Sequence, residues 1–153
     1  PVETETFVAI GQRMVKKCDG VPLAIKTLGG LSRFKISEVE WLSIENNPRW
    51  GQTEVLPSLQ MSFDHLQSSS LKSCFSFCSF FPKDFVMKKD QLIQLWIALD
   101  LLHDPDIIIS MEDKGECYFN IFLWNSLFQD VKMDKLQNIV SCRMHDLVHD
   151  LAL

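Results

Sequence analysis

Apolar residues recur at helical spacing along most of this 153-residue chain, and Pro and Gly interrupt them at short intervals. From Phe7 to Cys18 they follow one face of a helix, and Gly20 comes next, at the usual position of a C-terminal cap. Pro22 suits the first turn of a second helix, 22–34, because its missing N–H costs nothing there. A succession of short amphipathic helices predicts a mainly α fold.

Three more helices are predicted before Pro82. Ser37 and Glu40 have capping-box spacing, which places a helix over 37–46. Further helical patterns cover 54–66, with Pro57 in the first turn, and 68–81. The pair Gly29–Gly30, inside the second helix, predicts the close approach of another backbone. We therefore expect residues 1–82 to form a small helical bundle.

A second pattern follows Pro82. Helices are predicted over 88–102 and 110–129, the latter capped by Ser110 or Asp113. Two short strands within 127–134 and 138–146 flank a polar turn, and helical spacing returns from His145. The order helix, helix, hairpin, helix is typical of a winged-helix domain. The expected fold is thus a helical bundle, 1–82, followed by a winged-helix domain, 83–153, with a short β-hairpin.

Charge limits the partners that such a chain can bind. Acidic residues outnumber basic ones by 20 to 15, and the excess lies in residues 54–153. A chain with this charge is a poor match for a phosphate backbone or an anionic membrane. Uninterrupted apolar runs are far shorter than the roughly 20 residues that span a bilayer. We therefore expect no direct nucleic-acid partner and no membrane span.

The cysteines indicate a reducing compartment. Their number is odd, and no pair has Cys-x-x-Cys spacing; they are Cys18, Cys74, Cys78, Cys117 and Cys142. Reduced thiols in the cytoplasm are the better interpretation, with the nucleus as an alternative. Cys74 and Cys78 lie one helical turn apart among phenylalanines, which favours packing in the core.

The stretch "MHDLVHDLA" (144–152) has the two-histidine spacing of a metalloprotease helix. Asp146, however, is one methylene shorter than the Glu that serves as base in such sites, and no third ligand follows His149. No Gly-x-Ser-x-Gly elbow and no Walker loop occurs anywhere in the chain. The sequence therefore predicts neither a metal site nor a catalytic site.

A winged helix also suggests a DNA-binding module, which we keep as the alternative function. Such a reader needs basic residues on the helix before the hairpin and on the wing. The helix predicted over 110–129 carries acidic and amide groups instead, including Glu112, Asp113 and Glu116. A nucleic-acid function is accordingly the weaker reading.

Three stretches in register resemble one family. "GVPLA" (20–24), "CFSFCSFFPKD" (74–84) followed by "LIQLWIA" (92–98), and "MHDLVHDLA" are similar to motifs of plant nucleotide-binding leucine-rich-repeat disease-resistance proteins. The second motif is closer to the coiled-coil class. The resemblance implies the two helical ARC subdomains of the NB-ARC module, a helical bundle and a winged helix. The chain would be a fragment of an intracellular immune receptor in plant defence.

The resemblance also implies a cofactor and partners. In that family the two subdomains fold over ADP or ATP, which an upstream P-loop domain holds, with Mg²⁺ there. Leucine-rich repeats follow downstream, and activated receptors form oligomers. The fragment itself would catalyse nothing, whereas the full-length parent would be a weak ATPase through its P-loop domain.

The functional residues of the family are assigned only to positions of this chain that match the family motifs. By resemblance, Pro22 and Leu23 contact the adenine side of the nucleotide, and His145 approaches the ADP β-phosphate. Gly20, Met144 and Asp146 shape or hold these segments. A plainer interpretation is that His145 only caps the last helix and packs on the wing. The chain departs from the family pattern at Leu99–Asp106 and at Trp124–Asn125.

Overall fold

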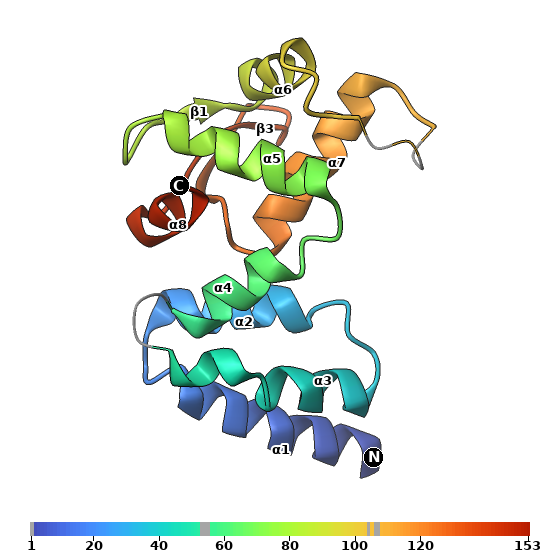
Figure 1. The fold of residues 1–153 in the computed structure, drawn as a ribbon, viewed down its shortest axis with the longest axis vertical. Coiled ribbons are helices and arrows are strands. Elements are labelled where there is room, and N and C mark those ends of the chain that lie inside the picture. The colour runs from blue at the N-terminus through green and yellow to red at the C-terminus, as the bar shows by residue number, and fades with distance from the viewer. Residues whose placement is uncertain (1, 53–55, 104, 106–107) are drawn as a thin grey trace. The chain divides into compact units, whose positions relative to one another are not determined.

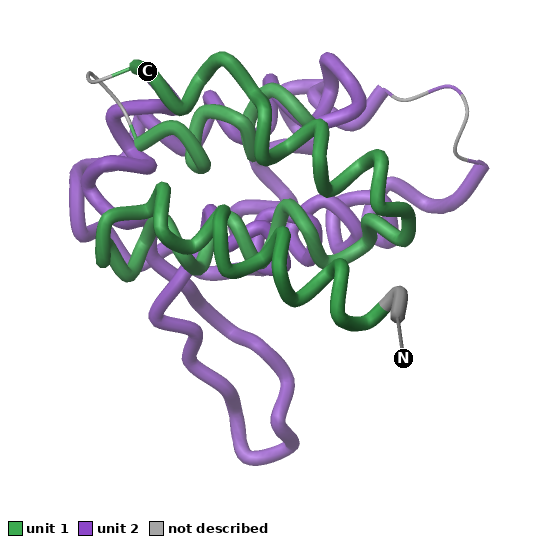
Figure 2. The backbone as a smooth tube through the Cα atoms, turned by 90° about the horizontal axis from the view of Figure 1, so that it is seen from below, with its two compact units in different colours: residues 1–65 green, residues 66–153 purple. Residues whose placement is uncertain are grey.

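The computed structural model describes residues 2–52, 56–103, 105 and 108–153. The chain divides into two compact units, residues 1–65 and residues 66–153 (Figure 2). Both are built mainly of helices, and the second also holds a small antiparallel sheet. The predicted class, mainly α with a helical bundle followed by a winged helix, is confirmed.

Unit 1 is a bundle of short helices (Figure 1). Its elements are α1 (Val2–Lys17), α2 (Pro22–Ser32), α3 (Glu38–Glu45), η1 (Pro48–Gly51) and α4 (Pro57–Asp64). Their apolar faces meet in a core that includes Ile10, Met14, Leu28, Ile44 and Met61, each less than 5% exposed. Full burial of such a side chain stabilises the fold by about 1.5–3 kcal/mol.

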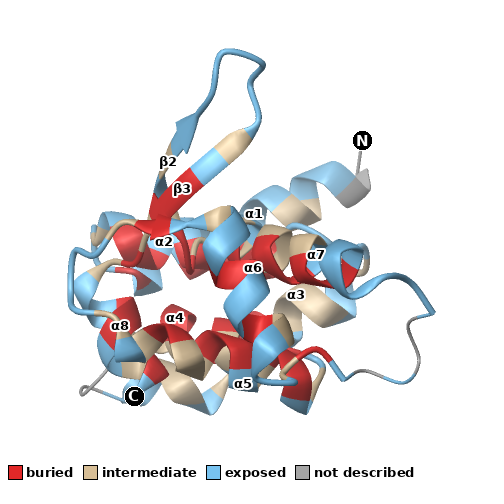
Figure 3. Ribbon diagram, turned by 90° about the horizontal axis from the view of Figure 1, so that it is seen from above, coloured by how far each residue is buried: buried red, intermediate tan, exposed pale blue. Residues whose placement is uncertain are grey.

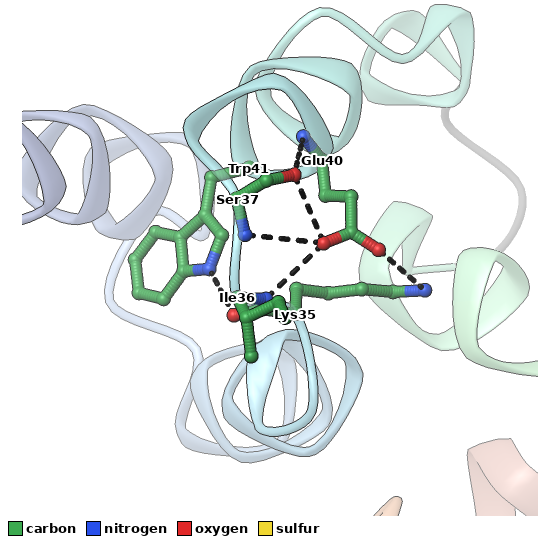
Figure 4. Close-up of polar contacts among 5 residues, drawn as sticks. All are labelled: Lys35, Ile36, Ser37, Glu40 and Trp41. Carbon is green, nitrogen blue, oxygen red and sulfur yellow. Dashed lines mark hydrogen bonds and ion pairs between the residues drawn. The ribbon is translucent and has the colours of Figure 1, made fainter.

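The predicted capping box at the start of α3 is confirmed (Figure 4). The Glu40 N–H donates to Ser37 Oγ at 3.3 Å, and the Glu40 carboxylate accepts the Ser37 N–H at 3.2 Å. Hydrogen bonds from Ser37, together with the nearby Lys35 ammonium, lower the pKa of Glu40. Trp41 closes the turn by donating its indole N–H to the Lys35 carbonyl at 3.0 Å.

Buried hydroxyl groups join α2 to α4. Ser58 Oγ donates to the Ala24 carbonyl at 3.0 Å, and Ser62 Oγ donates to the Thr27 carbonyl at 3.3 Å. The close approach expected at Gly29 is not there, since a Cβ built on Gly29 meets nothing within 4 Å. Small hydroxyl side chains, rather than Gly29, therefore mark the contact between these helices.

Unit 2 has the predicted order of helix, helix, hairpin and helix. Its elements are α5 (Ser69–Phe77), η2 (Cys78–Phe80), β1 (Met87–Lys88), α6 (Lys89–Ala98), α7 (Met111–Trp124), β2 (Gln129–Met133), β3 (Ile139–Arg143) and α8 (Asp146–Ala152). Ser110 caps α7 by accepting the Asp113 N–H at 3.1 Å. The extension of this helix to residue 129 was wrong, because Asn125 caps it and Ser126 turns the chain with φ 56°.

The sheet of unit 2 has three strands in the order β1-β3-β2. Both pairings are antiparallel, and β1, which the sequence did not predict, pairs Met87 with Cys142. The register of β2 and β3 shifts between Gln129 and Lys132, where Asp130 has a positive φ of 52°. The hairpin tip, residues 132–138, is exposed (Figure 3). It forms the wing.

Aromatic rings fill the core of unit 2. Phe122 on α7 lies 5.8 Å from Trp96 on α6 and 5.7 Å from Phe75 on α5, measured between ring centroids. Helix α5 thus packs with α7, and it also contacts α8. The compact unit therefore begins at Leu66, before the module boundary expected after Pro82. The expected boundary, which follows sequence motifs, stays a prediction.

Candidate functional site

The Gly20–Leu23 segment forms the turn between α1 and α2 in unit 1. Asp19 and Gly20 both have positive φ, 50° and 72°, and the Val21 N–H donates to the Cys18 carbonyl at 3.0 Å. Pro22 is the first residue of α2, as predicted, and it is exposed. Leu23 is buried, with 8% of its surface exposed. A ligand at this turn would meet the Pro22 ring and only the edge of Leu23.

His145 is the N-cap of α8 in unit 2. Its Nδ1 accepts the backbone N–H of Leu147 at 3.1 Å. A nitrogen that accepts carries no proton, so in the neutral ring the proton is on Nε2. Within the described residues Nε2 has no hydrogen-bond partner, and the ring is partly exposed. The capping role is therefore confirmed, and it leaves one N–H donor available to a ligand.

The two neighbours of His145 have opposite environments. Met144 is buried, with 5% exposed, whereas Asp146 opens α8 in solvent. Lys83 forms an ion pair with Asp150 at 2.7 Å, and this contact raises the pKa of Lys83. Asp146 adds a smaller attraction to the same ammonium. Met144 anchors the segment by packing, and Asp146 contributes only to the surface field.

His149, the second histidine of "MHDLVHDLA", is buried in unit 2. The residue is 9% exposed, and Nε2 lies 2.7 Å from the Phe81 carbonyl oxygen. Because a carbonyl only accepts, Nε2 carries the proton, and Nδ1 is buried without a hydrogen-bond partner among the described residues. Asp150 Oδ1 lies 3.8 Å from Nδ1, beyond hydrogen-bond distance. Val148 and Ala152, both buried, turn α8 so that His149 faces inward.

The geometry disfavours the zinc interpretation of the two histidines. His145 uses Nδ1 to cap α8, and His149 uses Nε2 to bind Phe81. Across the described ranges, no three His, Cys, Asp or Glu side chains gather closely enough to hold a metal ion.

A small cavity lies beside α8. It measures about 10 Å³, and its lining includes Cys78, Phe81, Met87, Met144 and His149. Pockets for drug-sized ligands measure about 300–1,000 Å³, so this one is far too small for a nucleotide.

The thiols are reduced and mostly buried, as the sequence predicted for Cys74 and Cys78. Burial raises the pKa of Cys74 and Cys142 to about 12, and it also raises the pKa of Cys78 well above its usual value. Cys117 is the exposed thiol. A raised pKa removes the reactive thiolate, so the buried thiols serve as small apolar side chains.

The candidate residues form two groups. Gly20, Pro22 and Leu23 lie at one turn of unit 1, and Met144, His145 and Asp146 lie at the entrance to α8 of unit 2. Sequence reasoning missed His149 and its acceptor on Phe81. One indication of this contact was present in the sequence, because Phe81 lies in the motif "CFSFCSFFPKD" and His149 in the motif "MHDLVHDLA". The two motifs share no local structure.

Comparisons with known proteins point to one family. Residues 80–152 match the family described as "Disease resistance protein Winged helix domain". The chain is 42% identical over 150 residues to RGA4 of Solanum bulbocastanum and 40% identical to disease resistance protein RGA2 of the same plant. It is 28% identical over 156 residues to disease resistance protein RPM1 of Arabidopsis thaliana.

These alignments cover 95% of this chain for RGA4 and RGA2 and 98% for RPM1. The chain spans only 15% of the length of RGA4 and RGA2, and 17% of RPM1. No helix in the described part of the chain is both long and apolar enough to cross a bilayer. Residues 80–152 are therefore a winged-helix domain of the disease resistance protein family, in a chain that belongs with the plant disease resistance proteins.

Proposed function

We propose that this chain is the regulatory part of an ADP/ATP-controlled switch in an intracellular plant immune receptor. It catalyses no reaction itself, and its parent binds the nucleotide mainly through a P-loop domain upstream, with Mg²⁺ there. Leucine-rich repeats downstream and an oligomer formed on activation complete the proposed receptor, which acts in the cytoplasm or the nucleus.

The observation that carries this proposal is the state of His145. Capping α8 through Nδ1 fixes the ring and leaves Nε2–H without a partner in the described part of the chain. The β-phosphate of ADP supplies negatively charged oxygen acceptors when it is bound. The cap already holds the His145 ring in place. A charge-assisted hydrogen bond from its Nε2–H to the phosphate therefore stabilises the state in which the nucleotide is bound.

Pro22 is suited to contact an apolar base. Its ring stands exposed on the first turn of α2, where an apolar base can lie against it without displacing a backbone hydrogen bond. Leu23, being 8% exposed, supports that turn more than it meets the base. A switch then follows by population shift, because these contacts favour one arrangement of the receptor over the other.

The nucleic-acid alternative has weaker support. On α7, Glu112, Asp113 and Glu116 are acidic, and Lys114 is buried. Lys89, on α6, is already paired with Glu116 at 2.7 Å. A helix with this surface repels a phosphate backbone. If duplex DNA nevertheless bound at low salt with a steep salt dependence, the alternative would be revived.

The test uses the full-length parent and two substitutions of His145. His145→Ala removes both the cap and the ring donor, whereas His145→Ser keeps an N-cap oxygen and removes the ring Nε2–H, whose reach the short hydroxyl lacks. We expect both variants to raise signalling without a pathogen, and His103→Ala, at an exposed histidine of unit 2, to leave it unchanged. Basal signalling of His145→Ser equal to that of the wild type would refute the role of His145.

A further inference from the structure

Helix α8 is too short to hold its own position. It has seven residues, and isolated helices shorter than about 12–15 residues are marginal in water. Its placement, and with it the direction of the His145 ring at its first turn, must come from contacts with the rest of unit 2. These contacts involve α5 and η2, which form the motif "CFSFCSFFPKD" together with the residues after them.

His149 connects the two motifs through its backbone and its side chain. Its backbone N–H donates to the His145 carbonyl at 2.9 Å, and its side-chain Nε2–H donates to the Phe81 carbonyl at 2.7 Å. The chain of bonds therefore runs from Phe81 through His149 to His145. Phe81 and His149 lie 68 residues apart in sequence.

A second polar contact of α8 is weaker. Lys83 and Asp150 are 2.7 Å apart, but their side chains are 46% and 50% exposed. Exposed ion pairs contribute little because water and salt screen them and two long side chains must be ordered. The bond from His149 is partly buried, so losing the donor leaves the Phe81 carbonyl without this partner at a place that water reaches less freely than the ion pair.

We propose that His149 is a positioning residue, which fixes the orientation of His145 by tying α8 to the Phe81 carbonyl. The effect of His149 on a nucleotide rests on the proposed function. The hydrogen bond between His149 and the Phe81 carbonyl, which we call the tie, does not. His149 does not touch the ligand in this proposal, and it acts only through His145.

The tie is tested on the 153-residue chain by amide hydrogen exchange. His149→Phe keeps the ring and removes the donor, whereas His149→Gln restores an N–H donor of similar reach. We expect His149→Phe to speed exchange of the α8 amides about tenfold, the effect of one lost hydrogen bond to a partly buried carbonyl. His149→Gln should recover most of the protection. His103→Phe, the matched change at an exposed histidine, should leave α8 unaltered.

Unchanged α8 exchange in His149→Phe would overturn the tie, as would equal acceleration in α7, which would mean general loosening. Should His149→Phe fail to fold, the wild-type chain still decides. The Hε2 proton of His149 should exchange slowly in ¹⁵N-edited spectra, and rapid exchange of that proton would equally overturn the tie.

The positioning role is tested on the nucleotide-loaded parent with a double-mutant cycle. We expect His149→Phe to speed ADP dissociation, and His149→Phe combined with His145→Ser to be no faster than His145→Ser alone. Additive effects would show that His149 acts independently of His145, against our proposal. If His145→Ser has no effect on ADP, the proposed function fails, while the exchange experiment still tests the tie.

Discussion

At the scale of single residues, backbone conformation decides what Gly20 contributes. Its φ of 72° lies in the left-handed region, yet a Cβ there would meet nothing within 4 Å. The requirement for glycine is therefore conformational, not steric packing. Asp19 beside it also has a positive φ, which Asp tolerates better than most residues.

Gly20→Ala should lower the free energy of unfolding of unit 1 by about 1 kcal/mol, the usual cost of the left-handed region for a residue with a Cβ. The matched change Gly29→Ala should raise it by about 0.5–1 kcal/mol, because Gly29 lies exposed in α2 with open space around it. Denaturant unfolding measures both. Equal signs for the two variants would contradict this account.

Thiol reactivity should follow burial. We expect a maleimide to label Cys117 in the native chain and the four buried thiols only after unfolding, since burial raises the pKa of Cys74 and Cys142 to about 12. Mass spectrometry of the labelled chain gives the count. A second thiol reacting as fast as Cys117 under native conditions would contradict the burial that the structure shows.

Local features could be predicted residue by residue, because they depend on neighbours in sequence. The capping box of Ser37 and Glu40, Pro22 at the start of α2 and the cap at Ser110 all belong to this kind. His149 could not, because its partner Phe81 is 68 residues away and helical spacing does not tell which face of a short helix is covered.

At the scale of elements, α6 and α7 meet at a glycine. A Cβ on Gly115 would overlap Ile93 Cγ2 and lie 3.3 Å from Ile93 Cβ. This contact explains a glycine in the middle of a helix, where it otherwise costs about 1 kcal/mol.

Gly115→Ala should destabilise unit 2 by about 1 kcal/mol, because overpacking of about 1–3 kcal/mol exceeds the gain in helix propensity. Ile93→Ala, which removes the obstructing atoms, should make the same glycine substitution harmless. Thermal unfolding of the four chains completes the cycle. Additive losses in the double variant would show that the two residues do not meet as described.

The ion pair between Arg13 on α1 and Glu45 on α3 should make the stability of unit 1 depend on pH. The Glu45 carboxylate accepts Arg13 Nε at 2.5 Å and Nη2 at 3.0 Å, which lowers its pKa. A carboxyl whose pKa is lower folded than unfolded stabilises above its unfolded pKa, about 4.3 for Glu. That stability is lost as the pH falls through the folded value.

We therefore expect the melting temperature of unit 1 to fall steeply below about pH 4.3, and Glu45→Gln to flatten that fall. Glu5→Gln removes the same charge from an exposed position on α1 and is the control. Calorimetry between neutral and acid pH measures all three chains. If the melting temperature of Glu45→Gln fell equally steeply at acid pH, the Arg13–Glu45 pair would not explain the pH dependence.

Element ends and short strands were harder to predict than the elements themselves. The apolar pattern of α7 continues through Leu127 and Phe128, both buried, although the helix ends at Trp124. Periodicity cannot separate a helix from the strand that follows it when both bury their side chains. Strand β1 has two residues, and its pairing with β3 depends on the hairpin already being in place.

At the scale of the whole molecule, the family match and the compactness of the fold divide the chain differently. The winged-helix match covers residues 80–152, whereas the second compact unit begins at Leu66. The motif "CFSFCSFFPKD" thus lies inside the compact unit that also holds His145. Order and class of the elements followed from periodicity, but the placement of α5 beside α8 required the three-dimensional contacts.

In our proposal, an upstream P-loop domain supplies most of the nucleotide site. Pro22 and His145 lie in different units, and the cavity beside α8 is about 10 Å³. We expect the isolated chain to bind ADP weakly or not detectably, and the chain extended through the upstream P-loop domain to bind it tightly. Titration calorimetry distinguishes these results. Tight binding by the isolated chain would place the site elsewhere than proposed.

The central claim, that His145 holds the nucleotide-bound state, is tested most directly by ADP dissociation from the full-length parent. The release of a fluorescent ADP analogue would be followed in the wild type, in His145→Ser and in the control His103→Ala. We predict release about tenfold faster or more for His145→Ser, the loss of one hydrogen bond to a charged group, and no change for His103→Ala. Equal release from the wild type and His145→Ser would contradict the claim.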